Sequence, residues 1–175
     1  SGSPYRKGIG QFVSRPLLPQ TISGTVNGVF GVREDNAAYN LFTRVHIYVM
    51  NCTTNTVHGT LLNQYEESGV AEWPTTTAYV GRALQSAQTL TSVTIPSDSN
   101  TYRIIAEMGC ISTATSGTNI TARLRIGCRN GSEGAALSAD LTVGAVSLHL
   151  CGYLEFSGTI TLAPHPLPNI GPETA

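Results

Sequence analysis

The sequence predicts an all-β protein: a two-sheet antiparallel β-sandwich, jelly-roll-like, with about eight or nine strands and an extended arm at each end. Residues 41–50 alternate with a period of two, so one face is apolar and β-branched and the other is amphipathic, as in a central strand. Charged residues make up only 12% of the chain, against roughly a quarter in ordinary soluble domains. Short alternating runs are separated by turn signals, and no segment has a convincing helical period.

The two ends of the chain are predicted to be arms outside the sandwich. Residues 1–20 contain three prolines together with basic residues and glycines, a composition that favours an extended arm over a packed strand. Residues 163–175 are rich in proline, which cannot donate to a sheet ladder, so the sandwich should end near Leu162. The sandwich domain is therefore expected at 21–162. Each arm is either a loose tail or a segment that becomes ordered against a neighbouring subunit.

Within the sandwich, residues 21–33 alternate between apolar and polar side chains, and their glycines suggest a bend or a bulge. A polar turn at 34–36 leads into the strand at 41–50. Residues 64–77 are irregular and are expected to form a long surface loop. Further strands are expected at 57–62, 79–84, 90–95, 102–108, 120–128 and 148–162.

The four cysteines, Cys52, Cys110, Cys128 and Cys151, lack the C-x-x-C spacing of zinc sites. If the runs that end at Cys110 and Cys128 form a hairpin, the two thiols lie at its opposite ends, out of reach of a disulfide. We expect buried free thiols that act as small hydrophobic side chains. A disulfide in another pairing remains the alternative, so the disulfide state is left open.

No catalytic motif is found: the G-x-S-x-G elbow of serine hydrolases and the D-x-D-x-D-G calcium loop do not occur. Glu66, Glu67 and Glu72 could bind calcium or act on a glycosidic bond, but the simpler expectation is a solvated acidic loop. The histidines are expected to be structural or surface residues, and they are His46, His58, His149 and His165. We therefore predict a protein that is not an enzyme and has no metal and no cofactor.

Aromatic residues surround the same loop, and they are the only candidates for a ligand-binding site. Tyr65, Trp73 and Tyr79 could stack on sugar rings, as aromatic side chains on β-sandwich loops do in lectin-like modules. The alternative for Trp73, the only tryptophan, is that it caps one end of the core.

The charge of the chain limits its partners. The formal net charge is −1, which provides no general attraction to nucleic acid or to acidic membranes. No run approaches the roughly 20 apolar residues needed to cross a bilayer. We expect neither nucleic acid nor membrane as a partner. A surface so poor in charge must be covered by hydroxyls, amides and backbone or by other subunits. The low charge therefore favours a protein that is a subunit of a larger assembly.

Several strand segments carry a resemblance to known proteins. They are Ser23-Gly24-Thr25-Val26 with Gly31-Val32, Arg44-Val45-His46-Ile47-Tyr48-Val49, Val57-His58-Gly59-Thr60-Leu61-Leu62, Glu72-Trp73-Pro74-Thr75-Thr76, Gln88-Thr89-Leu90, Arg103-Ile104-Ile105-Ala106-Glu107 and Tyr153-Leu154-Glu155-Phe156-Ser157. Together they resemble the β-sandwich structural proteins in the virions of tailed bacteriophages. The resemblance spans about residues 21–160 and leaves both arms uncovered, and the stretch 127–151 departs most from it.

The resemblance implies a non-enzymatic structural protein located in the virion, as a capsid decoration, a neck or head fibre, or a tail component. It implies a homo-oligomer, with a trimer as the expected form, whose N- and C-terminal arms contact other virion proteins. The alternative function is a carbohydrate-binding or host-receptor-binding adhesion module, with a host surface glycan as the partner of Tyr65, Trp73 and Tyr79.

Overall fold

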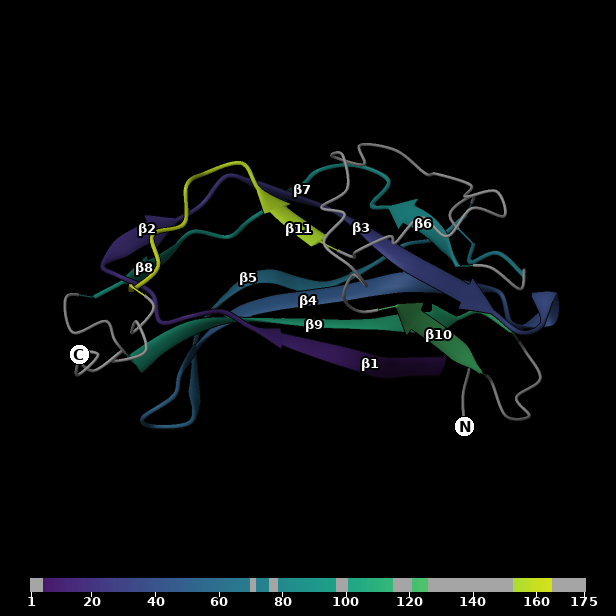
Figure 1. Cartoon of the computed structure of the whole chain (residues 1–175), viewed down its shortest axis with the longest axis horizontal. Helices are drawn as coiled ribbons and strands as arrows, with labels where there is room; N and C mark the ends of the chain where they lie inside the picture. The colour runs from purple at the N-terminus through teal and green to yellow at the C-terminus, as the bar shows by residue number, and fades with distance from the viewer. Residues whose placement is uncertain are drawn as a thin grey trace, which may run out of the picture.

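The computed structural model describes residues 5–69, 72–75, 79–96, 101–114, 121–125 and 153–164. These residues form two antiparallel sheets stacked in two layers, with a small third sheet at one end (Figure 1). The predicted all-β sandwich is confirmed. The described part of the chain contains eleven strands, more than expected, because the predicted run 21–33 is divided in two and because residues 5–13, predicted as part of an arm, form a strand.

The first sheet has four strands in the order β1 (Tyr5–Val13), β9 (Tyr102–Ser112), β4 (Leu41–Asn51) and β5 (Thr56–Glu66). β4 pairs with β9 along its whole length and with β5 on its other side. One face of β4 is fully buried, and it consists of Leu41, Thr43, Val45, Ile47 and Val49. The prediction of a central strand at 41–50 with this face in the core is confirmed.

The second sheet is built around β3 (Thr25–Glu34). One edge of β3 pairs with β6 (Val80–Ala83) and β7 (Gln88–Thr89). The other edge pairs with β10 (Ala122–Arg125) and β11 (Tyr153–Phe156), which lie end to end.

The register shows how closely β10 and β11 follow one another. Arg125 of β10 opposes Gly31, and Tyr153 of β11 opposes Val29. Only the position opposite Phe30 separates the two pairs. β10 and β11 are therefore collinear and together occupy one strand position beside β3, although they are far apart in the sequence.

The small third sheet pairs β2 (Gln20–Ile22) with β8 (Val93–Ile95). β2 and β3 are separated at Gly24, whose φ of 97° is a left-handed conformation that glycine adopts without steric cost. The bend predicted from the glycines of 21–33 is confirmed at this residue. The only helical element in the described residues is the 3-10 turn η1 (Ala37–Tyr39), whose first turn is capped by the side chain of Asn36.

The core lies between the two large sheets and continues beneath the small one. Its largest fully buried side chains are Leu17, Ile22, Phe30, Leu41, Ile47, Leu61, Trp73 and Ile95. The inward faces predicted for Tyr102, Ile104, Ala106 and Met108 are confirmed, since all four are buried. Burial of this set on both inner faces holds the two layers together.

The N-terminal segment differs from the prediction. Residues 5–13 are extended, but they are β1, an antiparallel edge strand that pairs with β9 from Tyr5↔Ser112 to Val13↔Ile105. The prediction of an arm outside the sandwich is therefore wrong for these residues. The composition misleads because an edge strand needs few apolar residues, and because Pro16 and Pro19 lie beyond the ladder of β1.

At the other end, Leu162 forms a β-bridge with Leu17, and the Ala163 N–H donates to the Pro16 carbonyl at 2.8 Å. This is where proline content predicted the sandwich to end. The remainder of the predicted C-terminal arm, 165–175, lies outside the described residues.

β9 and β10 belong to different sheets, so the hairpin on which the argument about Cys110 and Cys128 depended is not present in the described residues. One further expectation is wrong. The segment 34–36 is not simply a polar turn, because Glu34 is only 1% exposed. Its carboxylate accepts hydrogen bonds from the Leu41 N–H and the Thr75 hydroxyl, both at 3.1 Å, which offsets part of the cost of burying it.

Candidate interaction surface

β1 forms one edge of the four-stranded sheet, and no other described strand pairs with its outer side. Six of its nine residues are exposed and three are half-buried, so none of its side chains belongs to the closed core. The large hydrophobic residues that the described part of the chain exposes are Tyr5 and Val13 of β1 and Val57 of β5. All three belong to the two outermost strands of this one sheet.

An ion-pair network ties β1 to the far side of its own sheet. The guanidinium of Arg6 makes a two-point contact with the carboxylate of Glu66 on β5, and the second of these bonds measures 3.0 Å. Arg44 of β4 donates to the same carboxylate at 3.2 Å. The hydrogen bond from Arg6 and the positive charges of both arginines hold the pKa of Glu66 below its usual value.

A second polar contact lies further along β1. The Gln11 amide donates to Glu107 of β9 at 3.2 Å, and the Tyr48 hydroxyl of β4 donates to the same oxygen at 2.9 Å. Burial and the Glu107 carboxylate raise the pKa of Tyr48. Polar side chains thus connect β1, β9 and β4 on the face of the sheet that points away from the core.

The backbones of β1 and β9 approach very closely at Gly109. A Cβ atom at this position would lie 2.1 Å from the carbonyl oxygen of Lys7, a distance that no side chain can occupy. The register of β1 shifts between Gly8 and Gly10, which is a β-bulge. Bulges, and charged residues such as Arg6 and Lys7, are devices that hinder the pairing of a free edge with a further strand.

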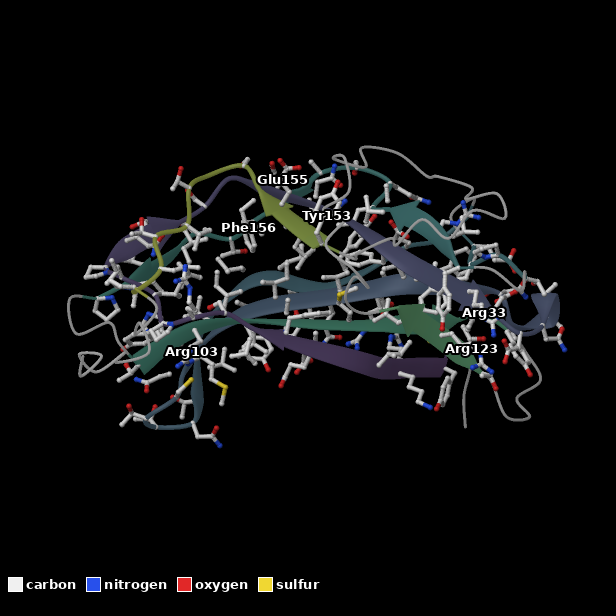
Figure 2. All side chains as sticks on the ribbon, viewed as in Figure 1. Arg33, Arg103, Arg123, Tyr153, Glu155 and Phe156 are labelled. Carbon is white, nitrogen blue, oxygen red and sulfur yellow. The ribbon has the colours of Figure 1, made fainter. Side chains whose placement is uncertain are left out.

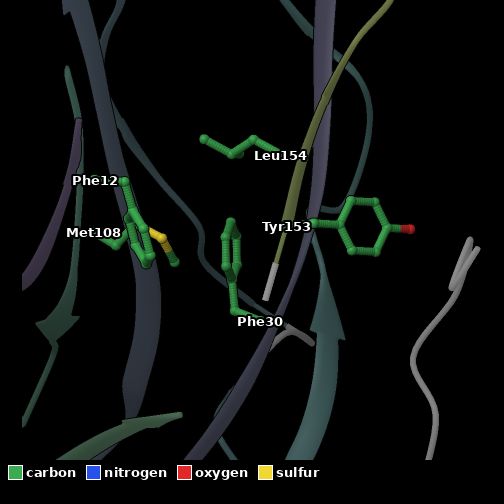
Figure 3. A pocket seen from close by; sticks show the side chains of 5 residues that line it. All are labelled: Phe12, Phe30, Met108, Tyr153 and Leu154. Atoms are coloured by element: carbon green, nitrogen blue, oxygen red, sulfur yellow. The ribbon is translucent and has the colours of Figure 1, made fainter. Parts of the chain in front are cut away.

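On its inner side, β1 contributes to an apolar cavity of about 160 Å³ between the two sheets. Phe12 and Met108 line it from the four-stranded sheet, and Phe30, Tyr153 and Leu154 line it from the other sheet. In Figure 3, Phe12, Phe30, Met108 and Leu154 point toward the cavity, whereas the Tyr153 ring points away from it. Phe12 is therefore the side chain through which β1 lines this cavity, and Ile9 of β1 also packs against the core.

The two histidines that the structure describes make contacts to backbone. Nδ1 of His46 lies 3.0 Å from the Leu62 carbonyl oxygen and 3.2 Å from the Gln64 nitrogen, where β5 has extra residues relative to β4. Nε2 of His58 lies 2.9 Å from the Thr94 carbonyl oxygen. These contacts agree with the structural role expected for both. His149 and His165 lie outside the described residues.

The structure does not assemble the predicted sugar-stacking site. Trp73 is only 2% exposed, and its indole N–H donates to the Thr43 hydroxyl at 3.1 Å, so it cannot offer a ring face to a sugar. Tyr65 is partly buried against the core, and its burial raises its pKa. Tyr79 lies beneath the Arg33 guanidinium, 5.4 Å from the ring centre. Trp73 instead belongs to the core, which was the alternative expectation.

The acidic residues predicted to lie on a solvated loop are in different surroundings. Glu66 ends β5 and is bound by two arginines, and Glu67 is only 3% exposed. The Glu67 carboxylate accepts a hydrogen bond from the Gln85 N–H at 2.9 Å. The solvated loop is therefore wrong for these two residues. Among the described residues, no group of three His, Cys, Asp or Glu side chains could hold a metal ion.

The structure describes two of the four cysteines, and both are free thiols. Cys110 is buried as expected, and its burial raises the thiol pKa to about 11. Cys52 is exposed in the turn between β4 and β5, so the expectation of a buried thiol is wrong there. Cys128 and Cys151 lie outside the described residues.

The opposite layer carries a separate charged group. Arg123 of β10 makes a two-point contact with Asp35, with Nε 3.1 Å from one carboxylate oxygen and Nη2 3.0 Å from the other, and Arg33 lies 3.7 Å from the same carboxylate. Figure 2 shows Arg33 and Arg123 at one end of the molecule and Arg103 toward the other. The bonds from Arg123 lower the pKa of Asp35. This group ties β10 to β3.

The residues of β1 are part of the N-terminal arm predicted to contact other virion proteins, but the sequence does not identify them as a strand, because their glycines and bulge interrupt the two-residue alternation. The one signal available was the short run Gln11-Phe12-Val13, which alternates in the manner of a strand.

The chain matches no known protein family, no curated protein and no solved structure. No helix within the described ranges is long and apolar enough to cross a membrane.

Proposed function

We propose that this chain is a non-enzymatic structural subunit of a tailed-bacteriophage virion, which works by packing against copies of itself and against other virion proteins. The proposal is supported by the strand segments that resemble such proteins, by the β-sandwich architecture and by the small proportion of charged residues. Its mechanism is burial of apolar and backbone-polar surface between subunits.

One observation carries the proposal: the exposed apolar side chains are gathered on one sheet. Val13 is 56% exposed and Val57 is 57% exposed, on the two outermost strands of the four-stranded sheet. By register with Ile105 and Met50, both side chains lie on the face away from the core. Large apolar side chains of this kind stabilise a complex when a partner buries them, whereas on a free surface they contribute no burial free energy.

The proposal is tested by measuring the molar mass of the full chain with size-exclusion chromatography and light scattering. Wild type should form a discrete oligomer, with a trimer as the expected form. A Val13→Lys/Val57→Lys variant should shift toward the monomer, because both charges would be placed in the contact. Ser92→Lys, which is exposed between β7 and β8, should leave the oligomer unchanged. A wild-type chain that stays monomeric at all concentrations would overturn the proposal.

A further inference from the structure

β1 is attached to the body of the protein through a firm anchor that lies just after it in the chain. Leu17 is fully buried, and its N–H donates to the Tyr102 carbonyl at 2.8 Å. Ser14 continues the contacts with β9, because its N–H donates to the Ile104 carbonyl at 2.9 Å and its own carbonyl accepts from Arg103 at 2.8 Å. Arg15, which is exposed, and Pro16 then connect Ser14 to the anchor. β1 and Ser14 can therefore leave β9 together by rotation at Arg15 and Pro16, while Leu17 stays in place.

The place that β1 occupies is specific and costly to leave empty. Its polar partners belong to the body of the protein: Glu66 accepts from Arg6 and Glu107 accepts from Gln11. The Lys7 carbonyl packs against Gly109, where no Cβ atom would fit. Without β1, the N–H and C=O groups of β9 along this edge would lose their partners. Every copy of the chain carries the same acceptor groups, so β1 of a second copy would find identical contacts.

We propose that, in the assembly, β1 of one copy leaves its own sheet and pairs with β9 of a neighbouring copy, in the register from Tyr5↔Ser112 to Val13↔Ile105. The inference rests on the proposed function and names the contact by which the subunits join. Exchange keeps every contact of β1, so it costs little at the high local concentration of an assembly. It also places Val13, which is exposed in the single chain, beside the connection that crosses between subunits.

The bulged and charged edge of β1 supports exchange over simple addition of a further strand. In an edge-to-edge contact, the outer side of β1 would have to pair across its bulge and beside Arg6 and Lys7. In an exchanged contact, the bulge and the charges keep the partners they already have, including Glu66 for Arg6. Strand exchange therefore uses the geometry that β1 and β9 already possess.

The experiment places one cysteine on β1 and one on β9 at opposed positions, Gln11→Cys and Glu107→Cys, with Cys52, Cys128 and Cys151 replaced by serine. The full-length double variant is oxidised as an oligomer and run on a denaturing gel without reductant. Exchange predicts loss of the monomer band and the appearance of covalent multimers. Refolding the two single variants together, one with a mass tag, should join unlike chains through a disulfide. Val13→Cys with Ile105→Cys is a second pair that leaves the Gln11–Glu107 contact in place.

The outcomes separate this inference from the proposed function. Covalent multimers from the double variant, with unlike chains joined in the mixture, support exchange. A particle that is oligomeric by light scattering, but whose chains run as internally cross-linked monomers, overturns exchange and leaves the proposed function standing. A chain that is monomeric in both measurements overturns both. Each single variant alone provides the background of non-specific cross-linking.

Discussion

The carboxylate of Glu34, the last residue of β3, accepts a hydrogen bond from the N–H of Leu41, the first residue of β4, at 3.1 Å. Its other oxygen accepts from the Thr75 hydroxyl, and the Glu34 N–H donates to the Pro74 carbonyl at 3.1 Å. One buried side chain thus joins the two sheets and the segment 72–75. Burial raises the pKa of Glu34, and the nearby negative charge of Glu72 raises it further.

Replacing Glu34 by Gln should change how stability depends on pH. Because the pKa of Glu34 is higher in the folded chain than in the unfolded chain, its stabilising contribution is complete below the unfolded pKa and is lost as pH rises through the folded pKa. Gln does not titrate, and its amide can still accept from Leu41 and donate to the Thr75 hydroxyl. Unfolding in denaturant at about pH 4 to 7 should therefore show wild type losing stability relative to Glu34→Gln as pH rises. A difference that is constant across this range would contradict the prediction.

Replacing Trp73 by Ala should destabilise the fold by about 3–5 kcal/mol, because it empties a core position and leaves the Thr43 hydroxyl without its indole partner. Tyr79→Ala is the matched control and should cost only about 1 kcal/mol, since this ring is half-buried and stacks on Arg33. Because Trp73 is the only tryptophan, its fluorescence reports directly on this site. Strong quenching by acrylamide in the folded protein would show that the indole is not buried.

The thiols of Cys52 and Cys110 should differ sharply in reactivity. In a chain with Cys128 and Cys151 replaced by serine, a disulfide reagent at about pH 8 should modify Cys52 rapidly and Cys110 only on unfolding. With a pKa of about 11, the buried Cys110 has almost no thiolate at that pH. Cys52→Ser should abolish the fast reaction. Two rapidly reacting thiols per folded chain would contradict the burial of Cys110.

Gly109 should tolerate no side chain, whereas its partner Gly8 should. Gly109→Ala would place a methyl group against the Lys7 carbonyl and should force β1 off β9, at a cost of about 1–3 kcal/mol. Gly8→Ala meets nothing within 4 Å and should leave stability unchanged. Trypsin cleavage after Arg6 and Lys7 should accelerate in Gly109→Ala alone. Equal behaviour of the two variants would contradict the close approach of the two backbones.

The collinear register of β10 and β11 predicts that the fold survives without residues 126–152. Replacing them by a single valine should join Arg125 to Tyr153 with one residue opposite Phe30, and should preserve the β-type circular dichroism and cooperative melting. Joining Arg125 directly to Tyr153 is the control. It shifts the register of β11 by one residue and turns every following side chain to the other face, so it should be markedly less stable. Unfolding of both variants would contradict the prediction.

Periodicity was enough to find the strands whose two faces differ. The alternation of 41–50 placed Val45 and Ile47 in the core, and the glycines of 21–33 indicated the bend that occurs at Gly24. β1 was assigned to an arm, because its bulge and glycines interrupt the alternation that marks a strand. For the predicted sugar-stacking site, the sequence does not reveal whether Trp73 is exposed. Its neighbours in the chain are acidic, but its burial depends on which strands pack against it in the folded protein.

The amino-acid sequence by itself determined the class of structure and the inward faces of the long strands, since these follow from the period of the apolar side chains. Tertiary structure alone decided that β1 completes a sheet, that β9 and β10 lie in different layers, and that Glu34 and Trp73 are buried. The physical reason is that strand pairing joins residues far apart in the chain. A local pattern specifies which face of a strand is apolar, but it does not specify which strand becomes its neighbour.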